Sequence, residues 1–337
     1  MNGLPASTRQ FIDELVRSTG ADSPEEAIRG KARELIQKLE ATFGCQMPVD
    51  VNVLASLQGI HGSNDLPIQS PDAELVPRSE GGVEMRVHPD RPETRQRFSI
   101  AHEITHTFFP DYEQKGWCRT DARFRNREDP DQYLEMLCDI GAAELLFPQP
   151  WFGNDAASVS DASGLVSLAT TYHASREATV RRFVETATEA IAAVYFVWKL
   201  KPTQKKTIGR KDQMNLLGIT PEDEVREALR LRIEYTIPSE CFRSAGHYLP
   251  NDKSIESAGP IYEAALTGQP CDGECFLELG QSAGTYNIMA VPLWTEETQR
   301  GSKGENMVAA VLKPMDVRKP SKKRKTPEPG RSLFDDL

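Results

Sequence analysis

The sequence predicts an α+β protein in which a mainly helical domain with a small sheet precedes a domain rich in β-strands. Three observations predict this class. Apolar residues recur at three- and four-residue steps through much of the first 191 residues, which is the period of amphipathic helices. From about residue 192, short β-type runs alternate with Gly, Pro and Asp, as in strands joined by turns. A length of 337 residues suits two domains.

The first elements are indicated by their start signals. Residues 7–43 carry helical periodicity, and Ser23 followed by Pro24 is typical of a helix cap and first turn. Asp50 is placed to cap a short helix. Residues 81–89 alternate apolar and polar side chains, which predicts a half-exposed strand. Such a strand at a sheet edge can bind an extended peptide; a plain hairpin strand is the alternative.

Further helices follow. Pro92 lies near the start of the next one and Pro110 ends it. A polar loop, 111–130, leads into a strongly apolar helix that Pro148 ends. Residues 164–191 indicate two helices joined by a short turn, which is the shape of a helix-turn-helix.

These changes of pattern set the predicted domain boundaries. Residues 1–163 form the first domain and 164–192 the helix-turn-helix-like pair. Residues 193–316 form the β-rich domain. Residues 317–337 are a basic tail of low complexity, which we expect to be disordered.

Charge and hydropathy limit the classes of partner. The net charge of −10 and the pI near 5.3 provide no general attraction to nucleic acid or to acidic membranes. The sequence has neither a secretory signal pattern nor an apolar run of membrane-spanning length, so we expect a cytoplasmic protein without a membrane partner. The six cysteines are scattered. Cys271 and Cys275 are interpreted as unrelated thiols rather than a metal or redox pair.

The segment FSIAHEITHTFFP, residues 98–110, contains the strongest functional motif. His102 and His106 are four residues apart, so on a helix both imidazoles can reach one ion. Zinc lowers the pKa of a bound water to ~7, and Glu103 is placed to take the proton. Apolar neighbours favour a buried metal site over two solvated histidines; these neighbours are Ile100, Ala101, Ile104, Phe108 and Phe109.

A catalytic zinc site usually has three protein ligands and one open position, so a further ligand is expected. Glu135, in the apolar helix before Pro148, is the best candidate. Asp139, one turn later, can hold a histidine ring through its second nitrogen. The competing carboxylates are Glu128, Asp129, Asp131 and Glu144. Tyr112 and His173 are candidate transition-state stabilisers, with an ordinary surface role as the alternative for each.

RFSIAHEITHTFF followed by LEMLCDIGAAELLFP resembles the ImmA/IrrE-type metallopeptidases. PVDVNVLASLQGI upstream and GLVSLATTYHASREATVRRF downstream resemble segments of the same family in the same order, so the resemblance covers roughly residues 28–190. It implies a zincin-like peptidase domain in which His102, His106 and Glu135 bind the metal and Glu103 is the general base. Zinc is the expected metal and manganese the alternative.

The resemblance also implies a substrate class. Members of this family are endopeptidases that cut helix-turn-helix repressors, which derepresses genes of the radiation or DNA-damage response or of mobile elements. The domain order is similar to that of the radiation-response branch, which carries a GAF-like C-terminal domain. This chain departs from the family in having Asp139 where Asn is frequent, and in its long loop at 111–130.

We therefore expect a zinc endopeptidase that cleaves a helix-turn-helix repressor, with the C-terminal domain as a sensor. The alternative is a DNA-binding regulator with a structural metal, which would use Arg181 and Arg182. Neighbouring glutamates cancel most of that charge, so DNA binding is not favoured. A metal-stabilised module without activity is a third hypothesis, against which the intact Glu103 argues.

Overall fold

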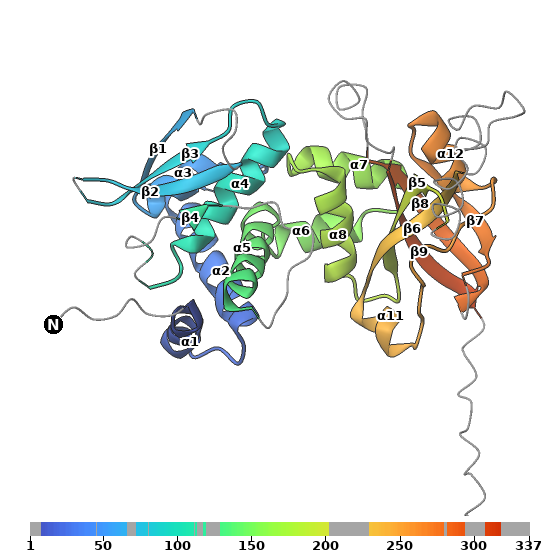
Figure 1. Cartoon of the computed structure of the whole chain (residues 1–337), viewed down its shortest axis with the longest axis horizontal. Coiled ribbons are helices and arrows are strands. Elements are labelled where there is room, and N and C mark those ends of the chain that lie inside the picture. The colour runs from blue at the N-terminus through green and yellow to red at the C-terminus, as the bar shows by residue number, and fades with distance from the viewer. Residues whose placement is uncertain are drawn as a thin grey trace, which may run out of the picture.

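The chain folds into two α+β halves with a helix pair between them (Figure 1). Each half contains one sheet, which confirms the mixed α+β class. The computed structural model describes residues 8–44, 46–65, 72–79, 81–110, 112, 117–118, 129–201, 229–279, 282–293 and 307–317. The predicted tail lies outside these residues except for Val317, as does most of the loop at 111–130.

Three helices begin the N-terminal half, and the second and third start where their capping residues predict. They are α1 (Thr8–Thr19), α2 (Pro24–Phe43) and α3 (Val51–Leu57). The Ser23 hydroxyl accepts a hydrogen bond from the Glu26 amide at 3.2 Å. Asp50 Oδ1 accepts one from the Asn52 amide at 2.9 Å. Both side chains satisfy amides that have no acceptor within the helix itself.

The small sheet has the strand order β1-β3-β2-β4. Its strands are β1 (Ile60–Asp65), β2 (Ala73–Pro77), β3 (Val83–Val87) and β4 (Trp117–Cys118). The prediction of a peptide-binding edge at residues 81–89 is wrong, because β3 pairs with β1 on one side and with β2 on the other. An alternating pattern reports the two faces of a strand and not which strands flank it.

α4 (Glu93–His106) and α5 (Pro130–Leu146) form the centre of the N-terminal core, and α6 (Trp151–Ala157) follows. α4 begins directly after Pro92. α5 begins at a cap in which Asp129 Oδ1 accepts a hydrogen bond from the Asp131 amide at 3.0 Å. Fully or almost fully buried apolar side chains of the two helices pack together; they are Ala101, Ile104, Leu134, Leu137, Ala142 and Leu145. The motif helix therefore lies inside the protein.

α7 (Ala162–Thr171) and α8 (Arg176–Thr186) pack against both halves (Figure 1). Leu168 and Tyr172 belong to the N-terminal core, whereas Leu165 and Val180 belong to a cluster on one face of the large sheet. The helix pair begins two residues before the predicted position, and strand β5 (Ala192–Lys199) follows it. These contacts join the two halves through apolar burial.

Two of the three arginines of α8, one of them a predicted DNA contact, are engaged within the protein. Arg182 is 4% exposed and donates a hydrogen bond to Glu144 at 2.7 Å. Arg176 Nη1 donates to the Pro292 carbonyl at 2.8 Å. Arg181 lies on the surface and pairs with a glutamate one turn further along α8. This arrangement is typical of packing helices, not of helices that bind phosphates.

The large sheet is antiparallel throughout, with the strand order β6-β5-β9-β8-β7. α7 and α8 cover part of one face. α11 (Glu240–Ser244) and α12 (Pro260–Thr267) contribute to the core on the other face. The strands are β5 (Ala192–Lys199), β6 (Arg230–Pro238), β7 (Cys271–Leu277), β8 (Gly284–Pro292) and β9 (Val308–Val317).

Cys271 and Cys275 lie four residues apart on the single strand β7. At ~3.3 Å per residue their Cα atoms are separated by about 13 Å, which is too far for a disulfide or for one shared ion. Both are free cysteines.

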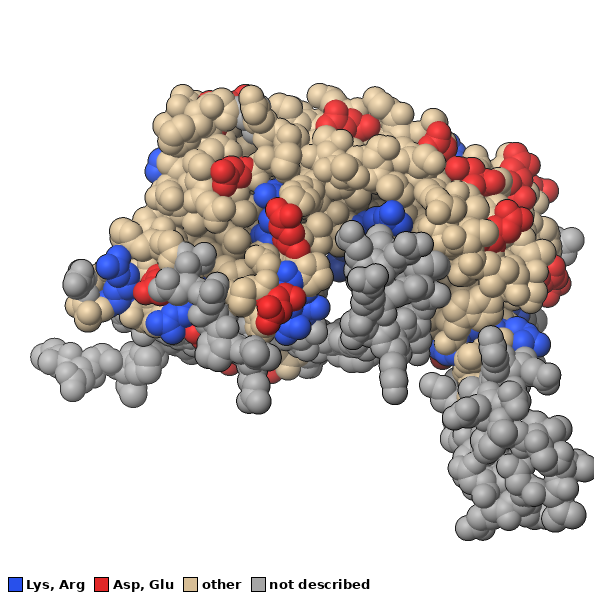
Figure 2. Space-filling view, turned by 90° about the horizontal axis from the view of Figure 1, so that it is seen from above, with Lys and Arg blue, Asp and Glu red and all other residues tan. Residues whose placement is uncertain are grey.

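Acidic side chains gather over the end of the molecule that α12 and β7 form, on the face shown in Figure 2. On the same face, lysines and arginines form separate small groups. Acidic residues outnumber basic ones in the whole chain, whose net charge is −10. Within the described ranges, the helices are too short or too polar to cross a membrane.

Candidate metal centre

The C-terminal end of α4 places two imidazoles and a carboxylate together in the protein interior. His102, Glu103 and His106 are each 0% exposed. The two imidazole ring centroids lie 5.1 Å apart with an angle of 70° between the ring planes, because residues four apart share one helix face. Polar groups buried this deeply need partners from neighbouring elements.

α5 supplies a carboxylate that faces both histidines. Glu135 Oε2 lies 3.3 Å from His102 Nε2, and Glu135 Oε1 lies 3.5 Å from His106 Nε2. The glutamate side chain is 18% exposed. The Nε2 atoms of both rings therefore converge on one carboxylate.

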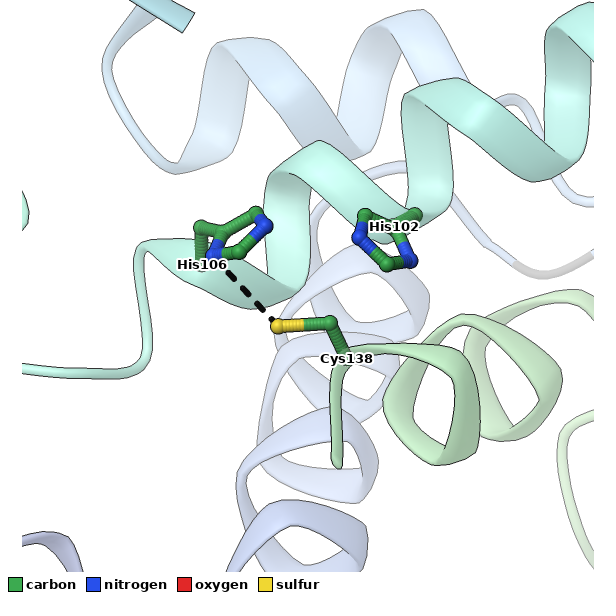
Figure 3. A group of neighbouring side chains, drawn as sticks. All are labelled: His102, His106 and Cys138. Atoms are coloured by element: carbon green, nitrogen blue, oxygen red, sulfur yellow. Dashed lines mark hydrogen bonds between the residues drawn. The ribbon is translucent and has the colours of Figure 1, made fainter. Parts of the chain in front are cut away.

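The other ring nitrogens face different residues of α5. His102 Nδ1 lies 2.9 Å from Asp139 Oδ1, and His106 Nδ1 lies 3.4 Å from Cys138 Sγ. Figure 3 shows the sulfur of Cys138 directed at the His106 ring. The sequence interpretation missed Cys138, although its position three residues after Glu135 and one before Asp139 puts it on much the same face of a helix.

The carboxylates near His102 favour a positive charge at this ring. Burial alone lowers the pKa of His102, but the hydrogen bonds and charges of Asp139 and Glu135 outweigh burial and raise this pKa to about 9. A proton and a metal ion compete for the same imidazole nitrogen. The carboxylates that favour a protonated His102 ring therefore also favour a metal cation bound at this ring.

The donor atoms fit a divalent cation of the zinc type. Two ligand atoms at ~2.0–2.1 Å from a tetrahedral ion lie about 3.3 Å apart, and the Glu135 oxygens lie 3.3 and 3.5 Å from the two Nε2 atoms. Imidazole ligands suit zinc, while carboxylates also suit manganese. His102, His106 and Glu135 can thus hold such an ion.

The structure does not bring every predicted site residue to this group. His173 lies in the turn between α7 and α8, with Nε2 3.3 Å from Glu93 at the start of α4. Nine residues of helix, about 13 Å at 1.5 Å per residue, separate Glu93 from His102. Tyr112 is partly buried against the N-terminal core, and its role stays a prediction.

The carboxylates that competed with Glu135 have other surroundings. Asp129 caps α5, and Asp131 accepts a hydrogen bond from Thr8. Glu144 is 3% exposed and pairs with Arg182. Glu128 lies outside the described residues. Among the described carboxylates of this loop and helix, Glu135 is the one placed within 3.5 Å of both motif histidines.

Gly141 allows α5 to approach α4 closely. A Cβ atom at this position would lie 2.4 Å from Thr105 Cγ2 and 2.7 Å from Thr105 Oγ1. Thr105 is fully buried, and its hydroxyl donates to the Ala101 carbonyl at 2.9 Å. The β-branched side chain has little rotational freedom in a helix, so it does not readily move aside.

Gly141→Ala is therefore expected to push α5 away from α4. The predicted cost is about 1–3 kcal/mol of unfolding free energy, as for overpacked cores. Metal affinity falls as well, because Glu135 and Asp139 move with the helix. Urea unfolding and a zinc-chelator competition measure the two effects.

Gly30→Ala is the matched control. Gly30 also lies within a helix, α2, and a Cβ there would meet nothing within 4 Å. This change should leave zinc affinity intact and stabilise the protein by up to about 1 kcal/mol. Equal behaviour of the two variants would contradict the close-approach argument.

The comparison with protein families agrees with the motif. Residues 67–184 match the family model for the IrrE N-terminal-like domain (Peptidase_M78). The matched segment contains α4, α5, α6, α7 and most of α8. The match supports the ImmA/IrrE family and a regulator of the metallopeptidase type.

Among solved structures, the chain is similar to a Mycobacterium tuberculosis transcriptional regulator. The sequence identity is 11% and the TM-score is 0.48, over 92% of this chain and 81% of that one. A likeness at this level carries no conclusion about function. No curated protein matches the chain.

Proposed function

We propose that the protein is a zinc-dependent endopeptidase that cleaves a helix-turn-helix transcriptional repressor. One observation carries the proposal: the Nε2 atoms of His102 and His106 converge on the Glu135 carboxylate, and the buried Glu103 directly follows His102 on α4. The IrrE-like family match supports the same class.

In this proposal His102, His106 and Glu135 hold zinc, with manganese as the alternative metal. Asp139 orients the His102 ring, which its 2.9 Å contact with Nδ1 supports. The aspartate is a stronger acceptor than the asparagine frequent at this place in the resembling family.

A zinc ion in such a site polarises a carbonyl and makes water more acidic. The proton transfers of the reaction are carried out by a residue of the chain. A Glu103 carboxylate oxygen accepts a proton from the attacking water, which adds to the scissile carbonyl carbon. Glu103 then returns this proton to the leaving amine nitrogen as the C–N bond breaks. Burial of Glu103 keeps bulk water from competing for the proton.

The substrate class rests on the family resemblance. Cutting a helix-turn-helix repressor derepresses its genes, here those of a stress or DNA-damage response or of a mobile element, in the cytoplasm. The five-stranded domain serves as a GAF-like sensor in this proposal. Its separate core, with helices on both faces of the sheet, supports an independent domain function.

The direct test is incubation of the purified protein with a repressor encoded beside its gene. We expect cleavage at one site, abolished by a chelator and restored by zinc or manganese, read out by mass spectrometry of the fragments. Metal removal should affect cleavage without unfolding the large sheet. Cleavage that persists after complete metal removal would reject the proposal.

A further inference from the structure

Cys138 is a buried thiol that the proposed mechanism does not use. It is 0% exposed and lies on α5 between Glu135 and Asp139. Its sulfur lies 3.4 Å from His106 Nδ1 (Figure 3). The sulfur thus contacts a residue of the metal centre from the same helix that supplies Glu135.

The two histidines have parallel surroundings. Each directs Nε2 toward Glu135 and Nδ1 toward another residue of α5. For His102 that residue is Asp139, at 2.9 Å; for His106 it is Cys138, at 3.4 Å. An imidazole that binds a metal through Nε2 carries its proton on Nδ1, where it needs an acceptor.

We propose that Cys138 is the positioning residue of His106. Its sulfur accepts the Nδ1–H hydrogen bond, which fixes the tautomer and the orientation of the ring. The inference rests on the proposed function only in that the two histidines bind a cation. No bond to sulfur forms or breaks.

The geometry favours this role over direct metal ligation. Ligand atoms of His102, His106 and Cys138 lie within 4.8 Å of one another, so a His-His-Cys ligand set has to be considered. The sulfur, however, lies at the Nδ1 atom of His106, whereas the Nε2 atom is the one that faces Glu135. The Glu135 carboxylate already faces both Nε2 atoms.

The role also makes the two histidines unequal. A sulfur is a weaker hydrogen-bond acceptor than a carboxylate, so His106 is held less firmly than His102. Loss of the acceptor at position 138 should therefore weaken metal binding through His106.

The test compares Cys138→Ala with Cys138→Ser in the full chain. Zinc affinity is measured by competition with a chelator, and cobalt(II) binding by absorption spectroscopy. We expect Cys138→Ala to lose about 10–100-fold in zinc affinity, as when other partners of ligating histidines are removed. Cys138→Ser retains an acceptor and should recover most of this loss. The cobalt spectrum of the wild type should lack a sulfur-to-metal charge-transfer band.

Cys241→Ala is the matched control, because Cys241 is exposed and its sulfur contacts the Thr188 carbonyl; zinc affinity should not change. Unchanged affinity in Cys138→Ala would overturn the positioning role. A charge-transfer band that Cys138→Ala abolishes would overturn it in favour of direct ligation. A wild-type protein that binds neither metal would overturn both this inference and the proposed function.

Discussion

A Glu103→Gln variant is expected to bind zinc as tightly as the wild type and to cleave about 10²–10⁴-fold more slowly. Glutamine matches glutamate in size but cannot accept a proton at neutral pH. Glu103 is fully buried and directly follows His102 on α4, while Glu135 is the carboxylate that faces both Nε2 atoms. Single-turnover cleavage and zinc stoichiometry measure the two properties separately.

Glu34→Gln provides the control for the loss of one negative charge. Glu34 lies on α2 with its side chain 65% exposed and pairs with Lys31, so neither property should change. If Glu103→Gln cleaves at the wild-type rate, Glu103 is not the general base. If the variant loses its zinc, Glu103 is a ligand and the proposed assignment of Glu135 is wrong.

Arg182→Ala is expected to destabilise the protein by about 3–5 kcal/mol, because it leaves a buried carboxylate without its main partner. Arg182 and Glu144 have side-chain exposures of 5% and 3% and lie 2.7 Å apart. Arg29, at 3.3 Å from Glu144 and 32% exposed, compensates only in part. The midpoint of urea unfolding measures the effect.

Arg181→Ala is the neighbouring control. Its side chain is 62% exposed and pairs with Glu185 one turn away, so the expected change is below about 1 kcal/mol. Similar losses for the two arginines would contradict the buried-pair argument. Salt-dependent DNA binding that Arg181→Ala abolishes would instead favour a DNA-binding regulator.

Local signals predict the elements that hold the site. Ser23 and Asp50 cap α2 and α3 as expected, and α4 begins directly after Pro92, although it ends at His106, before the predicted end at Pro110. Capping and helical periodicity depend on residues a few positions apart, which a single sequence shows directly. The metal motif is equally local, since one helical turn joins His102 to His106.

Contacts between distant segments could not be predicted in the same way. The central position of β3 depends on the two strands that pair with it. Glu144 on α5 pairs with Arg182 on α8, which lies 38 residues further along the chain. The approach of Gly141 to Thr105 and the contact of Cys138 with His106 depend on how α5 lies against α4. None of these leaves a periodic signal in the sequence.

The helix α5 also restricts which changes of chain length the protein tolerates. Glu135 faces the histidines, and Glu144 faces Arg182 on α8. Their nine-residue separation corresponds to about two and a half turns of helix, so the two carboxylates lie on opposite sides. One inserted or deleted residue between them would rotate one carboxylate by about 100° relative to the other. Either the metal centre or the junction with α8 would then lose its partner, so the length of this segment is as restricted as its composition.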